Sequence, residues 1–131
     1  MILVDSSVWV DYFNGKKTAK TDWLDSALGN KPIVMGDLIM AEVLQGFQRD
    51  EDFRAARQLL LEFPFMEMVG KDIAMRSAGN YRFLRRRGVT VRKTIDVLIG
   101  TFCIVHGLYL LHDDRDFDPL VKHLKLKIIQ T

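Results

Sequence analysis

Four acidic positions stand out because each lies where an apolar element begins or ends. Asp5 follows the apolar run Ile2–Val4, and Asp114 belongs to an acidic group that follows another such run. Glu42 and Asp96 occur early in apolar helical segments. Carboxylate oxygens are preferred ligands of hard divalent ions, and such ions promote phosphoester hydrolysis. If these acids meet in space, they could support metal-assisted hydrolysis.

Each acid also has a structural explanation that the residues leave open. Asp5 could cap the helix that follows it. Glu42 has no Lys or Arg three or four residues away, so it is either a surface carboxylate or part of a site. Asp96 needs a cation because burial of an unpaired charge is costly, and either Arg92 or Lys93 or a metal ion could supply it.

The elements that must position these acids alternate between helix and strand. Apolar residues at helical spacing predict helices, and short apolar runs predict strands. The expected helices include Ser7–Phe13, Leu38–Phe47, Asp72–Arg87 and Ile95–Val105, and the expected strands include Ile33–Met35, Phe65–Val69, Leu108–Leu111 and Leu126–Ile129. One face of the long helix is expected to carry Ala74, Ala78, Tyr81 and Leu84. This alternation predicts an α/β fold with a mainly parallel sheet.

In such a sheet the carboxyl ends of the strands meet at one edge, so the four acids are expected to face one crevice. Carboxylates that lie close together repel one another, and a divalent cation relieves that repulsion. A ligand set made only of oxygens favours Mg²⁺, or alternatively Mn²⁺, over Zn²⁺.

Composition narrows the class of protein. The chain has 131 residues, of which 48% are hydrophobic and 27% charged, and this composition predicts one globular domain over residues 1–131. A net charge of +2 does not indicate a nucleic-acid binder by itself. The single cysteine, Cys103, excludes an internal disulfide and is expected to be a buried thiol. No signal peptide or membrane span is expected, so the protein is predicted to be cytoplasmic.

Four short motifs resemble those of the PIN-domain ribonucleases, in particular the VapC toxins of type II toxin–antitoxin systems. They occur in the same order along the chain and are Ile2-Leu3-Val4-Asp5-Ser6-Ser7-Val8-Trp9, Ala41-Glu42-Val43-Leu44-Gln45-Gly46, Thr94-Ile95-Asp96-Val97-Leu98-Ile99-Gly100 and Leu111-His112-Asp113-Asp114-Arg115-Asp116-Phe117. One departure is His112, which stands where these toxins often carry Thr or Asn.

The resemblance implies a PIN-like three-layer α/β/α sandwich and a set of site residues. It implies that Asp5, Glu42, Asp96 and Asp114 are the catalytic acids. Of these, Asp5 and Asp96 are expected to bind the metal directly and Asp114 to belong to the same metal site. Asp116 and Ser7 are expected to be auxiliary residues.

The implied activity is Mg²⁺-dependent endoribonuclease action as the toxin of a toxin–antitoxin pair, with a VapB-like antitoxin as partner and a homodimer as the assembly. Basic residues near Asp96 are expected to contact RNA phosphates, since such contacts add affinity without reading sequence. They are Arg85, Arg86, Arg87, Arg92 and Lys93. The three consecutive arginines have a second explanation, because cations in the last turn of a helix complement its dipole.

Two other functions remain open at this stage. A receiver-type signalling domain also gathers acids and Mg²⁺ at the strand ends of an α/β sheet, although it would need an adjacent acid pair that Asp5-Ser6 does not provide. A DNA-directed nuclease would need the same carboxylates as a ribonuclease.

Overall fold

The computed structural model describes residues 1–131 and contains a four-stranded sheet with helices on both faces. The strands are β1 (Ile2–Val4), β2 (Ile33–Gly36), β3 (Phe65–Met66) and β4 (Tyr109–Leu111). The helices are α1 (Ser6–Phe13), α2 (Ala19–Ala27), α3 (Asp37–Leu44), α4 (Asp50–Leu60), α5 (Gly70–Arg86), α6 (Thr94–His106) and α7 (Asp118–Leu124), with a 3-10 turn η1 (Arg115–Phe117) before the last of them.

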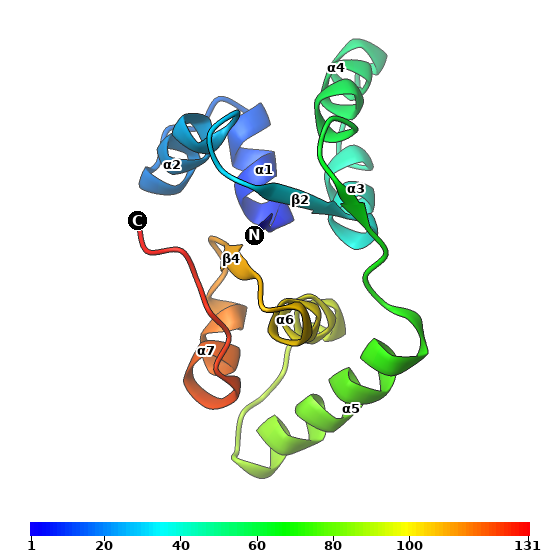
Figure 1. Cartoon of the computed structure of the whole chain (residues 1–131), viewed down its shortest axis with the longest axis vertical. Coiled ribbons are helices and arrows are strands. Elements are labelled where there is room, and N and C mark those ends of the chain that lie inside the picture. The colour runs from blue at the N-terminus through cyan, green and yellow to red at the C-terminus, as the bar shows by residue number, and fades with distance from the viewer.

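All strand pairs are parallel, in the spatial order β3-β2-β1-β4. Helices α1 to α4 lie on one side of the sheet and α5 to α7 on the other (Figure 1). The predicted three-layer α/β/α architecture with a parallel sheet is therefore confirmed.

Strand β1 occupies a central position in the sheet and brings Asp5 to its carboxyl edge. Its three residues are all buried, as expected of a strand covered by helices on both faces. It pairs with β2 on one side and β4 on the other, and the Asp5 amide continues the second pairing by donating to the Leu111 carbonyl at 2.8 Å. Because β1 and β4 run side by side, the residues that follow them emerge together.

Helix α6 is nearly enclosed, and it packs against α5. Cys103, on this helix, is fully buried, so the predicted buried thiol is confirmed; burial raises the pKa of the thiol. Gly107 ends the helix in the left-handed conformation, with a φ of 66°. No helix is long and apolar enough to cross a bilayer.

Several expected elements differ in detail. Helix α5 turns Ile73, Ser77 and Leu84 into the core, whereas Ala74 and Ala78 are exposed. The expected face was therefore right for Leu84 and wrong for the two alanines. Alanine is small enough to lie on either the buried or the exposed face of a helix, so the spacing of alanines did not determine which face of α5 packs against the core. The expected strand Phe65–Val69 pairs over two residues only, and Leu126–Ile129 contributes a single bridge from Ile128 to Leu110.

Candidate active site

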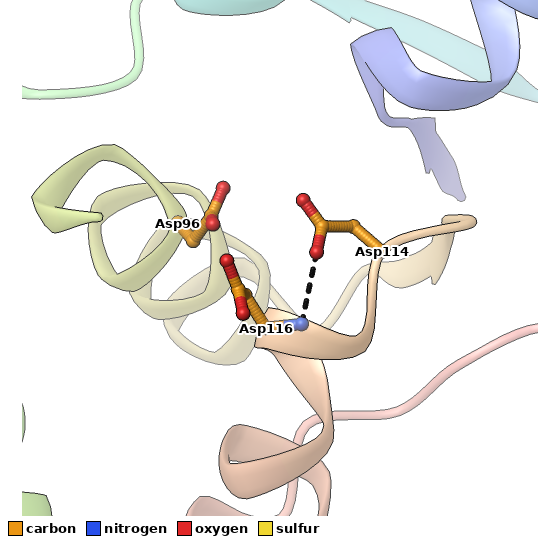
Figure 2. Close-up of side chains that lie close together, drawn as sticks. All are labelled: Asp96, Asp114 and Asp116. Carbon is orange, nitrogen blue, oxygen red and sulfur yellow. Dashed lines mark hydrogen bonds between the residues drawn. The ribbon is translucent and has the colours of Figure 1, made fainter. Parts of the chain in front are cut away.

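Three aspartates converge at the carboxyl edge of the sheet. One carboxylate oxygen each from Asp96, Asp114 and Asp116 can be chosen so that all three lie within 4.8 Å of one another. Asp96 comes from the first turn of α6, while the other two come from the segment after β4, and their carboxylates point toward a common centre (Figure 2). We call these three residues the acidic cluster.

The turn after β4 holds Asp114 in place. The Asp114 side chain caps η1 by accepting a hydrogen bond from the Asp116 amide at 2.9 Å, and its own amide donates to Nδ1 of His112 at 3.2 Å. The His112 ring is buried and packs on Phe117, with a centroid separation of 5.0 Å. Burial lowers the pKa of His112, which favours the neutral ring that this hydrogen bond requires. His112 thus helps to fix the conformation of the turn that carries Asp114.

Asp5 and Ser7 connect the ends of β1 and β4. Oδ2 of Asp5 accepts hydrogen bonds from the Ser7 amide at 3.1 Å and from Ser7 Oγ at 2.6 Å, so Asp5 does cap α1. Ser7 Oγ in turn accepts from the Asp113 amide at 3.1 Å. Asp5 is only 4% exposed, and burial raises the pKa of its carboxyl despite the bonds from Ser7.

Glu42 reaches the same region from α3. Its Oε1 accepts a hydrogen bond from Ser6 Oγ at 3.1 Å. Burial, together with the charge of Asp5, raises the pKa of Glu42. Asp5, Glu42, Asp96 and Asp114 all line one open cleft of about 480 Å³. The four predicted catalytic acids therefore share a cleft, while the expected auxiliary Asp116 belongs to the acidic cluster itself.

Lys93 lies at the centre of the acidic cluster. Its Nζ is 2.7 Å from Asp114 Oδ2, 3.3 Å from Asp96 Oδ2 and 3.5 Å from Asp116 Oδ2. Only the contact with Asp114 has hydrogen-bond geometry, which leaves the buried Oδ2 of Asp96 without a donor. The hydrogen bond to Asp114 raises the pKa of Lys93.

The same environment shifts the pKa values of Asp96 and Asp114 in opposite directions. Burial raises the pKa of Asp96 to about 6, against the attraction of Lys93. Burial also acts on Asp114, but hydrogen bonds from Lys93 and the Asp116 amide outweigh it and lower the pKa of that carboxyl. At Asp96, therefore, the attraction of Lys93 does not fully offset the effect of burial.

The predicted phosphate-binding residues fall into two groups. Arg92 lies 3.9 Å from Asp116, and with Lys93 it lines the surface around the acidic cluster. The run Arg85–Arg87 ends α5 away from that surface, where Arg87 stacks 3.5 Å above the Phe83 ring.

Two cations near the acids were not among the predicted residues. Arg115 lines the surface around the acidic cluster, and Lys16 lines the cleft that contains Asp5 and Glu42. The position of Arg115 between Asp114 and Asp116 was a usable signal. Lys16 lies in a loop with no motif around it.

The acidic cluster fits a hard divalent cation. Its donor atoms are all carboxylate oxygens, and one of them, Oδ2 of Asp96, is buried without a hydrogen-bond donor. A magnesium or manganese ion takes such oxygen ligands, whereas the absence of Cys from the cluster disfavours zinc. The residues present therefore suit the ion that the sequence predicted.

Comparisons with known proteins agree with this fold. The PIN domain family model matches residues 2–122. The chain is 32% identical over 129 residues to VapC ribonuclease Mb1587 of Mycobacterium bovis and to ribonuclease VapC11 of Mycobacterium tuberculosis, covering 97% of this chain and 96% of each relative. The chain belongs to the PIN-domain family.

The predicted resemblance to the VapC ribonucleases is also confirmed, since these relatives bear that name. Among solved structures, VapBC2 from Rickettsia felis, bound to a promoter DNA fragment, aligns with a TM-score of 0.76 at 15% identity over 98% of both chains. FitAcB from Neisseria gonorrhoeae aligns with a TM-score of 0.76 at 16% identity, covering 99% of this chain and 97% of that one. At such low identity these two structures support the fold.

Proposed function

We propose that residues 1–131 form one nuclease domain and that it is a Mg²⁺-dependent endoribonuclease, the toxin of a toxin–antitoxin pair. The observation that carries the proposal is the convergence of Asp96, Asp114 and Asp116, because the first two of these acids also line a cleft with Asp5 and Glu42. The relatives named as VapC ribonucleases support RNA as the substrate. Mn²⁺ is an alternative ion.

The side chains divide the work according to their surroundings. Asp5, Asp96 and Asp114 would hold the ion, Asp5 from the adjoining end of β1, and Asp116 would complete the acidic cluster. Glu42 is half-buried with a raised pKa, which suits a carboxylate that orients a water and accepts its proton. When bound, Mg²⁺ supplies activation of water and neutralisation of charge on the phosphoryl oxygens. Ser7 and His112 act as positioning residues, because each holds a segment that carries one of the acids.

Membership of the PIN-domain family removes the basis for a receiver-type signalling domain. A DNA-directed nuclease stays the second candidate, since the same carboxylates would serve either nucleic acid.

The test uses the full chain with Mg²⁺, a defined RNA and a DNA of the same sequence. We expect RNA cleavage that EDTA abolishes and that Asp96→Asn and Asp5→Asn each reduce by about 100-fold or more, because each removes an acid that contacts the reacting groups. Asp52→Asn, at an exposed position on α4, is the matched control and should cleave like wild type. Preferential DNA cleavage would favour the second candidate, and undiminished cleavage by Asp96→Asn would contradict the site.

We also propose a VapB-like antitoxin as partner, a homodimer as the assembly and the cytoplasm as the compartment. Two of the structural neighbours support the partner: one contains VapBC2 and another is a toxin–antitoxin complex from Klebsiella pneumoniae. A molar mass in solution near 15.1 kDa, that of one chain, would contradict the homodimer.

A further inference from the structure

The Lys93 ammonium lies where the carboxylates of the acidic cluster converge. It is within 3.5 Å of an oxygen from each of the three aspartates. These are contacts of one cation with three acids that come from two separate segments of the chain. The ammonium therefore lies in the region that a divalent ion held by the same acids would occupy.

An ammonium is a poor match for this position. It brings a single charge to three carboxylates and makes a hydrogen bond with Asp114 alone. Oδ2 of Asp96, on a residue 5% exposed, is paired with the ammonium at 3.3 Å but accepts no well-directed hydrogen bond from it. A divalent ion carries more charge and accepts several oxygen ligands at once, so it would satisfy that oxygen better.

The Lys93 side chain is able to leave. Lys93 precedes the first residue of α6, and its side chain is 48% exposed, so withdrawal of the ammonium into solvent would disturb no core packing. A lysine stem is flexible, and its charge is readily hydrated. The cost of moving it is therefore mainly the loss of its contacts with the acids.

We propose that Lys93 is a tethered cation that competes with the divalent ion for the acidic cluster, and thereby sets the ion concentration at which the site loads. This inference rests on the metal site in the proposed function. Lys93 compensates the repulsion among the aspartates until the ion displaces it, and the displaced ammonium then becomes available to an RNA phosphate.

Direct binding of Mn²⁺ to the full chain tests the proposal without an activity assay. Electron paramagnetic resonance of free Mn²⁺, titrated with wild type and with Lys93→Met, gives the two dissociation constants. Methionine retains an unbranched apolar stem and removes the charge. We expect the variant to bind Mn²⁺ more tightly by roughly tenfold or more, because the ion no longer displaces a charge from the site.

Arg92→Gln is the matched control. It removes one positive charge near the same cluster, but Arg92 approaches only Asp116, at 3.9 Å, and its side chain is 74% exposed. Its effect on Mn²⁺ affinity should be less than about threefold, since exposed charges are screened. Thermal unfolding adds a second readout. In EDTA, Lys93→Met should have a lower melting temperature than wild type, and saturating Mn²⁺ should raise the melting temperature of the variant by more than it raises that of wild type.

The outcomes distinguish this inference from the function on which it rests. If wild type binds Mn²⁺ and Lys93→Met binds it equally or more weakly, Lys93 does not compete with the ion. The proposed metal site is not contradicted by that result. An equal gain in Mn²⁺ affinity in Lys93→Met and Arg92→Gln also overturns the proposal, because the loss of any nearby positive charge would then explain the gain. No Mn²⁺ binding by any of the three proteins overturns both proposals.

Discussion

Asp96 is a carboxylate in a helix that is otherwise almost entirely apolar. Burial raises its pKa to about 6, and its best-placed neutralising group is a lysine that also serves two other acids. A protein that carries such a residue sacrifices stability, because an ionised carboxylate out of water needs more compensation than one shared ammonium gives. That cost is understandable if the carboxylate has a ligand to bind.

The raised pKa of Asp96 predicts how stability depends on pH without metal. The folded protein holds the Asp96 proton more tightly than the unfolded chain does, so ionisation of Asp96 lowers the free energy of unfolding as pH rises from about 4 to about 6. Asp96→Asn removes this cost. In EDTA its advantage over wild type should be on the order of 1–3 kcal/mol at about pH 7 and should nearly vanish at about pH 4.

Thermal or urea unfolding at the two pH values measures this difference. Asp52→Asn again serves as the control at an exposed position. An advantage of Asp96→Asn that is as large at the acidic pH as at neutral pH would show that Asp96 ionisation does not limit stability.

At the scale of elements, α6 has to lie close to α7 for Asp96 to meet Asp114 and Asp116. Gly100 permits this approach, because a Cβ at that position would collide with Cδ2 of Leu120 on α7. Leu120 is 1% exposed, so its side chain has little room to yield. The contact between these two helices thus helps to position the acidic cluster.

Gly100→Ala should therefore lower the free energy of unfolding by about 1–3 kcal/mol through overpacking. Gly79→Ala is the matched control in α5: a Cβ added there would meet no heavy atom within 4 Å, so helix propensity should raise stability by up to about 1 kcal/mol. Urea unfolding measures both. A Gly100→Ala protein as stable as Gly79→Ala would mean that α6 and α7 are not tightly packed.

At the scale of the whole molecule, a net charge of +2 conceals a separation of charges. Acids predominate in the cleft at the carboxyl edge of the sheet, which also contains Lys16 and Lys93. Arg92 and Arg115 lie around the acidic cluster, and Arg85–Arg87 lie farther away at the end of α5. A polyanion would be repelled by the acids alone. Cations around them would hold its phosphates near the cleft.

RNA binding should accordingly depend on salt. Measured by fluorescence anisotropy in EDTA, Arg92→Ala should weaken binding and reduce the slope of log affinity against log salt by about one, and the triple change of Arg85–Arg87 to alanine should act in the same direction. Lys31→Ala is the control, since Lys31 precedes β2 and so lies toward the opposite end of the sheet. Affinity unchanged by the arginine substitutions would remove these residues from the RNA-binding surface.

The sequence by itself determined the elements and the acids that they carry. Apolar runs that end in a carboxylate identified Asp5 and Asp114, and an apolar helix with one charge identified Asp96. Both patterns can be recognised within a short stretch of sequence, because the spacing of apolar residues reflects the local element and its buried face. The parallel sheet followed from the alternation of helix and strand, and it correctly brought the ends of β1 and β4 to one edge.

Only the tertiary structure decided how these residues meet. It put Asp116 in the acidic cluster and Lys93 at its centre, left Asp5 in the adjoining cleft, and turned Ile73 rather than Ala74 into the core. Such placements depend on the rotation and tilt of helices packed against elements far away in the sequence. Side-chain spacing within one helix does not encode them, because the packing partner sets which face is buried and how closely it approaches.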